Sequence, residues 1–268
     1  MLWRILHVGS RNPGMASVTR LCHRLKKKVE NMTEKTIGIL GGMGPEATLE
    51  LFAKIIANTP ADKDQEHLRV VIDSNPKVPD RTAAILHGGE SPVPVMAEGV
   101  EALRRAGADF VVIPCVSAHF FFDQLQREAG LPILSMFDVT AGHIRQDHPH
   151  IRTVGMLATT GTHQGGRFRE ELELAGIETL TPTQADQERV MAAIYEIKGA
   201  PGARERTAIG AEIRDIADRL IQRGAQGMVA GCTEIPLVLK PGDLSVPVFD
   251  TLLLLARAAI TAAGRQPI

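Results

Sequence analysis

Two cysteines stand at matching places in the sequence, each directly after a short apolar run. Phe110-Val-Val-Ile-Pro precedes Cys115, and Gly227-Met-Val-Ala-Gly precedes Cys232. Brief apolar runs bounded by Gly, Pro or polar residues are typical of buried parallel strands. Each thiol is therefore predicted to lie at the carboxyl end of a strand, where open α/β sheets bind ligands. Because a helix N-terminus favours the thiolate, both cysteines are candidates for acid–base chemistry.

The two cysteine motifs belong to an internal repeat with an offset of 117 residues. Gly107-Ala-Asp-Phe-Val-Val-Ile-Pro-Cys115 aligns without a gap on Gly224-Ala-Gln-Gly-Met-Val-Ala-Gly-Cys232, and residues 37–44 align on 154–161 at the same offset. We interpret this as a duplicated α/β unit with a pseudo-twofold axis, in which each half gives one cysteine to a shared cleft. The alternative is that each cysteine is a small buried apolar residue, its commonest role. The match at two strand ends favours the shared site.

Two thiols on opposite faces of a carbon atom could carry out proton transfer. One thiolate would remove a weakly acidic proton from carbon beside a bound carboxylate, and the other thiol would return a proton on the opposite face. Fixed positive charge and N–H dipoles would stabilise the developing enolate. Such symmetry suits a reaction whose substrate and product are mirror images. The candidate donors to the carboxylate are Arg81, on a loop, and the hydroxyls of Ser117, Thr159, Thr162 and Thr233 at strand ends.

Two other kinds of site have weaker support in the sequence. The glycines of Gly41-Gly-Met-Gly-Pro-Glu46 follow a predicted strand and could cradle phosphate, but the pattern is not G-x-G-x-x-G because Glu46 takes the last position. Cys115 and His119 could be metal ligands or a Cys–His nucleophile pair. A zinc site needs a fuller ligand set than this, so a surface or capping role for His119 is favoured.

The composition limits the classes of function. A chain of 268 residues, with 44% apolar and 23% charged residues, suffices for one large or two medium domains. Three cysteines favour a reducing compartment, and we expect a cytoplasmic protein. No apolar run approaches the roughly 20 residues of a membrane span. With 4% aromatic residues and no basic patch that contains them, nucleic-acid binding has little support.

The N-terminal segment differs from the rest of the chain. Residues 1–31 contain seven Lys or Arg and one Glu. An organelle-targeting helix has such a composition. The alternative, which we favour, is an upstream start, with Met32 beginning the compact part. In either case residues 1–35 are expected to be a flexible N-terminal extension that the fold does not need.

Predicted strands alternate with predicted helices from Thr36 onward, which indicates two similar, doubly wound, parallel-sheet α/β domains. We place the first domain at residues 36–139 together with 247–268, and the second at residues 140–246. Strands are expected at 36–40, 68–73, before Cys115, 132–135, 153–157, 178–180, before Cys232 and 246–249. Helices are expected at 45–57, 94–106, 119–129, 165–175, 185–197, 206–223 and 251–263, with a loop at 74–81.

Five motifs together give the chain a family resemblance. They are Gly41-Gly-Met-Gly-Pro-Glu-Ala-Thr48, Asn75-Pro-Lys-Val-Pro-Asp-Arg-Thr82, Pro114-Cys-Val-Ser-Ala-His119, Leu157-Ala-Thr-Thr-Gly-Thr162 and Gly231-Cys-Thr-Glu234. From Thr36 to the C-terminus the chain resembles the aspartate/glutamate racemases, in particular the aspartate racemase branch. The resemblance implies two similar α/β domains with the site between them, often in a homodimer. It also implies catalysis without pyridoxal phosphate and without a metal.

The resemblance also implies roles for individual residues. Cys115 and Cys232 would be the acid/base pair, Arg81 would meet the side-chain carboxylate of the substrate, and Lys198 would approach the substrate. The family usually has Cys-Asn-Thr after the first of these strands, whereas this chain has Cys115-Val-Ser117. Ser117 keeps a hydroxyl, but Val116 offers only its backbone N–H. The replacement of the family's Asn by Val116 is expected to change how the α-carboxylate or the amino group of the substrate is bound.

We expect a cofactor-independent racemase of an acidic amino acid, with aspartate as the first candidate. Another enzyme with the same paired thiols is the alternative: a broad-specificity amino-acid racemase, a hydantoin racemase or a maleate isomerase. Arg81 favours a dicarboxylate over an apolar amino acid. A third possibility is a ligand-binding homologue that has kept the cleft and lost turnover.

Overall fold

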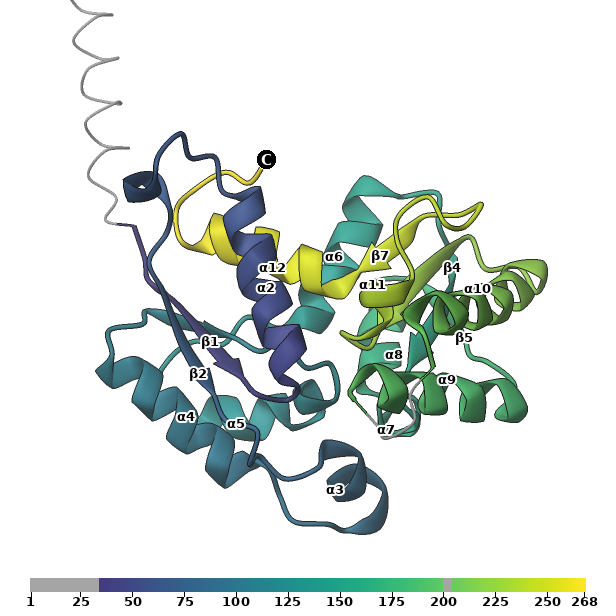
Figure 1. Cartoon of the computed structure of the whole chain (residues 1–268), viewed down its shortest axis with the longest axis horizontal. Coiled ribbons are helices and arrows are strands. Elements are labelled where there is room, and N and C mark those ends of the chain that lie inside the picture. The colour runs from purple at the N-terminus through teal and green to yellow at the C-terminus, as the bar shows by residue number, and fades with distance from the viewer. Residues whose placement is uncertain (1–33, 200–203) are drawn as a thin grey trace, which may run out of the picture. The chain divides into compact units, whose positions relative to one another are not determined.

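The first half of the fold is built on a parallel sheet with the strand order β2-β1-β3. The computed structural model describes residues 34–199 and 204–268, and its elements carry the labels of Figure 1. The strands are β1 (Ile37–Gly41), β2 (Val70–Ser74) and β3 (Phe110–Val112). The central strand β1 is buried along its whole length, because its sequence Ile-Gly-Ile-Leu-Gly has no polar side chain.

The second half repeats this arrangement in a parallel sheet of order β5-β4-β6-β7. The strands are β4 (Thr153–Ala158), β5 (Glu178–Leu180), β6 (Gly227–Gly231) and β7 (Val248–Asp250). β4 and β6 take the places of β1 and β3, as the repeat predicts. The amide of Val111 donates to the carbonyl of Pro132, and the amide of Met228 donates to the carbonyl of Pro247, both at 2.8 Å. The predicted pair of similar parallel-sheet α/β units is confirmed.

The predicted strand at residues 132–135 is wrong. This segment forms only an isolated parallel bridge between Val111 and Ile133. Pro132 has no N–H to donate to a neighbouring strand. Three residues later Ser135 is already the N-cap of a helix, since its hydroxyl accepts from the amide of Asp138 at 3.2 Å. Between Pro132 and the helix cap at Ser135, too few residues remain to form a strand.

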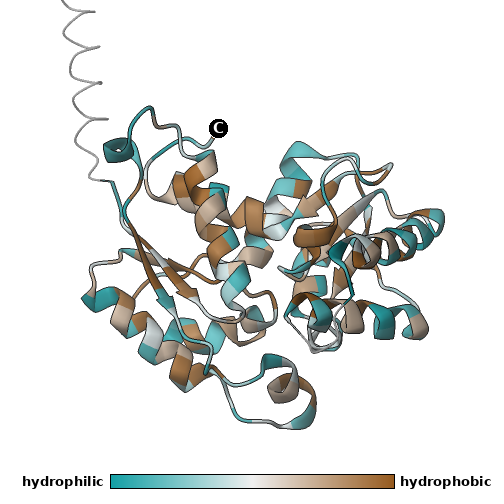
Figure 2. Ribbon diagram, viewed as in Figure 1, coloured by the Kyte–Doolittle hydropathy of each residue, from teal (hydrophilic) through white to brown (hydrophobic). Residues whose placement is uncertain are grey.

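Helices connect the strands, and several lie close to their predicted ranges. In chain order they are α2 (Pro45–Asn58), α3 (Arg81–His87), α4 (Val93–Arg105), α5 (Phe122–Glu128), α6 (Met136–Asp147), α7 (Thr160–Gly165), α8 (Arg167–Leu174), α9 (Gln184–Ile197), α10 (Arg206–Gln222), α11 (Ile235–Val238) and α12 (Thr251–Ala262). The short 3₁₀ helices within residues 34–199 and 204–268 are η1 (Asp64–Glu66) and η2 (Ser117–Phe121). In Figure 2, apolar residues predominate on α2 and α12, whereas α4 and α10 alternate between apolar and polar stretches.

α6 and α11 have no counterpart among the predicted helices, and three predicted segments differ from the observed ones. Arg81 is the first residue of α3 and not part of a loop, because the Asp80 side chain caps this helix by accepting from the amide of Ala83. The helix expected at 119–129 is divided into η2 and α5. The helix expected at 165–175 begins earlier, at α7, and is interrupted at Gly166, whose φ of 75° lies in the left-handed region.

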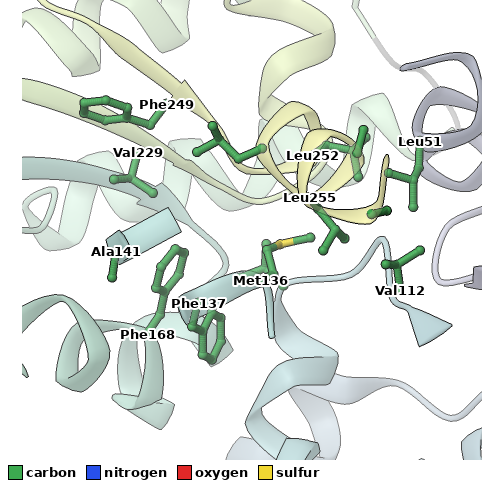
Figure 3. Packing of buried hydrophobic residues seen from close by; sticks show 14 of the residues in the cluster. Leu51, Val112, Met136, Phe137, Ala141, Phe168, Val229, Phe249, Leu252 and Leu255 are labelled. Carbon is green, nitrogen blue, oxygen red and sulfur yellow. The ribbon is translucent and has the colours of Figure 1, made fainter. Parts of the chain in front are cut away.

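The largest apolar cluster among the described residues includes side chains of α2, α6 and α12. Leu252 and Leu255 of α12 pack in one cluster with Leu51 of α2 and Met136 of α6 (Figure 3). Burying each such side chain contributes roughly 1.5–3 kcal/mol.

The C-terminal segment 247–268, which we assigned to the first domain, makes contacts in both halves of the fold. β7 pairs with β6 in the second sheet, whereas α12 packs on α2 and α6. The domain boundaries themselves stay a prediction.

Two expectations concern features outside these elements. The N-terminal extension predicted at residues 1–35 lies outside the described residues except for its last two positions. Among the described residues, no helix combines the length and apolar character that crossing a membrane requires.

Candidate active site

A cavity of about 410 Å³, its open mouth included, collects side chains from both halves of the fold. Both cysteines line it, Cys115 just beyond β3 and Cys232 directly after β6. The other predicted site residues in its lining are Arg81, Val116, Ser117, Thr159, Lys198 and Thr233. Thr162 is not part of the lining but touches it through hydrogen bonds described below. The repeat therefore brings the two predicted strand ends to one cavity.

Cys232 is held against a carboxylate. Its Sγ donates to Oε2 of Glu234 at 2.8 Å, and the Thr233 hydroxyl donates to the same oxygen at 3.2 Å. Cys232 and Glu234 are both buried. Burial raises the pKa of the Cys232 thiol well above its usual range, and the negative charge of Glu234 raises this pKa further. The thiol form of Cys232 is therefore the stable one in this geometry.

Cys115 has different surroundings. It is buried, and its amide donates to the carbonyl of Ile113 at 2.8 Å as β3 ends. Its own carbonyl contacts Nδ1 of His119 at 2.9 Å. His119 is buried beside Phe122 and Phe137, and burial lowers the pKa of its imidazole. The capping interpretation of His119 therefore fits better than a surface position, and His119 is not in the lining of the cavity.

The Arg81 side chain is oriented by three carbonyl groups. Nη1 donates to the carbonyls of Val78 at 3.1 Å and Pro79 at 2.9 Å, and Nη2 donates to the carbonyl of Met43 at 3.2 Å. Nε of Arg81 is buried and has no hydrogen-bond partner among the described residues. Because Nη2 carries two hydrogens and only one of these bonds uses it, two N–H groups remain for an anion. A carboxylate is the group that such a pair binds best.

Lys198 follows the last residue of α9 and adds a second positive charge. Its Nζ lies 3.7 Å from Oε1 of Glu234, and its side chain is 29% exposed. Burial alone would lower the pKa of Lys198, but the charge of Glu234 and the thiolate forms of Cys232 and Cys115 outweigh burial and raise it. Lys198 is therefore a cation near both thiols.

Three hydroxyls form a closed cluster at one wall of the cavity. Oγ of Ser117 lies 3.0 Å from Oγ1 of Thr159 and 3.3 Å from Oγ1 of Thr162, and the two threonine oxygens are 3.0 Å apart. Thr159 is the N-cap of α7, since its oxygen accepts from the amide of Thr162 at 3.1 Å. This cap positions hydroxyls of the second half against Ser117 of the first half. Such a cluster can donate to a carboxylate.

Several lining residues were not predicted from the sequence. Met191, Ile194 and Tyr195 of α9 face the cavity together with Lys198. Ile194, Tyr195 and Lys198 follow Met191 by three, four and seven positions, which places all four on one face of the helix. The prediction of Lys198 as a site residue could therefore have been extended to the other three. Glu234 lies within the motif that contains Cys232 but was not assigned to the site. No spacing rule marks a carboxylate two residues after a cysteine as its hydrogen-bond partner.

Comparisons with known proteins identify a family and structures with a similar fold. The family model described as Asp/Glu/Hydantoin racemase matches residues 40–259. The structure of an aspartate racemase from Picrophilus torridus is similar, with a TM-score of 0.77 and 30% identity over 87% of this chain and 96% of that chain. An aspartate racemase homologue from Pyrococcus horikoshii OT3 gives a TM-score of 0.67 and 28% identity, covering 85% of this chain and 99% of that chain.

A relative with a broader activity is also similar. The broad specificity amino-acid racemase RacX of Bacillus subtilis is 26% identical over 231 residues, which are 84% of this chain and 96% of the relative. The family match extends over most of the chain and includes both cysteine motifs. This chain belongs to the Asp/Glu/hydantoin racemase family of isomerases.

Proposed function

We propose that this protein racemises an acidic amino acid, with aspartate as the first candidate, and uses Cys115 and Cys232 as the acid/base pair. The observation that carries the proposal is that both thiols line one cavity together with Arg81. The reaction requires no pyridoxal phosphate in this scheme, because the bound α-carboxylate and the cations of the cavity stabilise the carbanion.

The chemistry consists of two proton transfers. The thiolate of one cysteine takes the α-proton of the substrate and becomes a thiol. The electron pair left on the α-carbon delocalises into the adjacent carboxylate. The thiol of the other cysteine then donates its proton to the opposite face of that carbon and becomes a thiolate. Atoms and charges balance, and the product is the mirror image of the substrate.

The substrate groups have matching partners. The unpaired N–H groups of Arg81 suit the side-chain carboxylate, and the hydroxyls of Ser117 and Thr159 suit the α-carboxylate, with Thr162 supporting them. Thr233 and Lys198 lie on the side of Cys232. A positive charge near the α-carboxylate stabilises the enolate that forms in the transition state.

Two substrate ranges are considered within the family: many amino acids, or dicarboxylic amino acids alone. The relative named as a broad-specificity racemase supports a wider range, whereas Arg81 supports dicarboxylates. Three further functions compete with the proposal: a hydantoin racemase, a maleate isomerase and a binding protein without turnover.

We also propose that the protein acts in the cytoplasm as a homodimer, and light scattering of the purified chain would test the dimer.

Incubation with L-aspartate in heavy water tests the proposal. NMR should show loss of the α-proton signal, and chiral chromatography should show D-aspartate. L-glutamate, L-alanine and L-serine in parallel give the substrate range. Binding of aspartate without exchange of the α-proton would instead identify a ligand-binding homologue. Equal exchange of all four amino acids would favour a broad-specificity racemase.

Val116→Asn tests whether the departure from the family pattern sets the substrate range. Val116 is buried and lines the cavity directly after Cys115. An added amide that gains a hydrogen bond to the substrate contributes about 1 kcal/mol, or roughly a fivefold gain in kcat/KM for aspartate. The matched control is Val116→Leu, whose side chain branches at the same carbon as that of Asn but has no amide. If neither variant changes turnover of any amino acid, Val116 has no part in substrate choice.

A further inference from the structure

The two halves differ at one pair of equivalent positions beside the thiols. The 117-residue offset that aligns Cys115 with Cys232 also aligns Ser117 with Glu234. Ser117 turns its hydroxyl to Thr159 and Thr162, whereas Glu234 turns its carboxylate to Cys232. Among the described residues, Sγ of Cys115 has no comparable acceptor. The duplicated site is therefore chemically asymmetric.

The Glu234 carboxylate is built into this position. It is 4% exposed, and Oε2 accepts from both the Cys232 thiol and the Thr233 hydroxyl. Oε1 faces Nζ of Lys198 at 3.7 Å. Both oxygens thus have partners within the site. The carboxylate is therefore held against the sulfur of Cys232 inside the cavity and does not form an ion pair at the protein surface.

Other charged groups of the cavity act on the same sulfur. Lys198, after α9, lowers the pKa of Cys232, which opposes the larger effects of burial and Glu234. Cys115, Arg81, Asp80 and the phenol of Tyr195 are the remaining titratable or charged groups in the lining. Of all these groups, only Glu234 is hydrogen-bonded to Cys232.

We propose that Glu234 is a positioning residue that keeps the proton on Cys232 in the resting enzyme, so that Cys115 acts first as the base. This inference rests on the proposed racemase function. The resting form reacts with the enantiomer whose α-hydrogen faces Cys115. After one turnover Cys115 carries the proton, and Cys232 is a thiolate beside a carboxylate. Because like charges at this distance repel, solvent returns a proton to Cys232 and removes one from Cys115.

The test measures the two thiols separately in the full chain. Iodoacetamide alkylates thiolates, so the rate of alkylation against pH, read for each cysteine by peptide mass spectrometry, gives an apparent pKa for each. In the wild-type protein Cys115 is expected to react faster than Cys232 at neutral pH. Glu234→Gln keeps the shape and removes the charge, and should move the Cys232 profile down by about one pH unit or more, with a smaller change at Cys115.

A second variant and a control complete the design. Lys198→Met removes the opposing cation and should move the Cys232 profile up, so the inference stays testable if Glu234→Gln does not fold. Glu46→Gln removes a carboxylate that is 46% exposed and pairs with Arg206, and should leave both profiles unchanged. An unchanged Cys232 profile in Glu234→Gln, or a Cys232 that reacts faster than Cys115 in the wild type, would overturn the inference. Alkylation needs no turnover, so failure of the heavy-water assay would be a separate result.

Discussion

Replacing either Cys115 or Cys232 by serine is expected to abolish racemisation, with a loss of roughly a thousandfold or more in kcat for each single variant. Inversion requires that a proton leave one face of the α-carbon and return on the other face. In the proposed mechanism each cysteine serves only one face, so neither can replace the other. A serine hydroxyl is a far weaker acid and base than a thiol, whose ordinary pKa is about 8.5.

The two serine variants should differ in the half-reaction that they keep. Each retains one thiol and so can exchange the α-proton of one enantiomer with solvent, provided that the carbanion lives long enough. Incubating each variant with L-aspartate and with D-aspartate in heavy water, and following the α-proton by NMR, gives the pattern. We expect Cys115→Ser and Cys232→Ser to exchange opposite enantiomers.

Controls separate this result from general damage to the protein. Cys22→Ser changes the third thiol, which lies outside the described residues, and should leave activity unchanged. The melting temperature of each serine variant should stay near that of the wild type, because serine is slightly smaller than cysteine. Near-normal racemisation by either Cys115→Ser or Cys232→Ser would refute the two-base mechanism.

The parts of the fold that were predictable from sequence are those with a strong local pattern. β1, β3, β4 and β6 are short apolar runs that recur at one offset, so the placement of Cys115 and Cys232 at equivalent sheet edges could be inferred from the sequence alone. The segment at residues 132–135 had the same apolar pattern but is bounded by a proline at one side and a helix cap at the other. Local hydrophobicity does not reveal whether a neighbouring strand is available to pair.

The parts of the site that escaped prediction depend on tertiary contacts. The Arg81 guanidinium is oriented by the carbonyl of Met43, which lies 38 positions earlier in the chain. Glu234 could equally have pointed to solvent, because nothing in the local sequence requires that it accept from Cys232. The three α9 residues Met191, Ile194 and Tyr195 face the cavity only because of how α9 packs. The spacing in the sequence indicates which thiols are the candidate reacting groups, whereas tertiary packing determines which side chains lie against them.

Arg81→Lys is expected to lower kcat/KM for aspartate by about 10- to 100-fold although the charge is kept. Charge-assisted hydrogen bonds contribute about 1.5–3 kcal/mol, and the lysine ammonium cannot present two parallel N–H groups to a carboxylate. Lysine also cannot reproduce the three bonds that Arg81 makes to the carbonyls of Val78, Pro79 and Met43. The cation would therefore lose its fixed direction as well as its shape.

The substrate dependence of this loss distinguishes recognition from misfolding. Turnover of alanine or serine, which have no second carboxylate, should fall much less than turnover of aspartate, so the ratio of the two kcat/KM values is the informative measurement. Arg206→Lys is the matched control, because Arg206 is 51% exposed, pairs with Glu46 and does not line the cavity. It should leave that ratio unchanged. If Arg81→Lys spares aspartate and weakens alanine or serine, Arg81 binds something other than the side-chain carboxylate, and the preference for acidic substrates loses its structural basis.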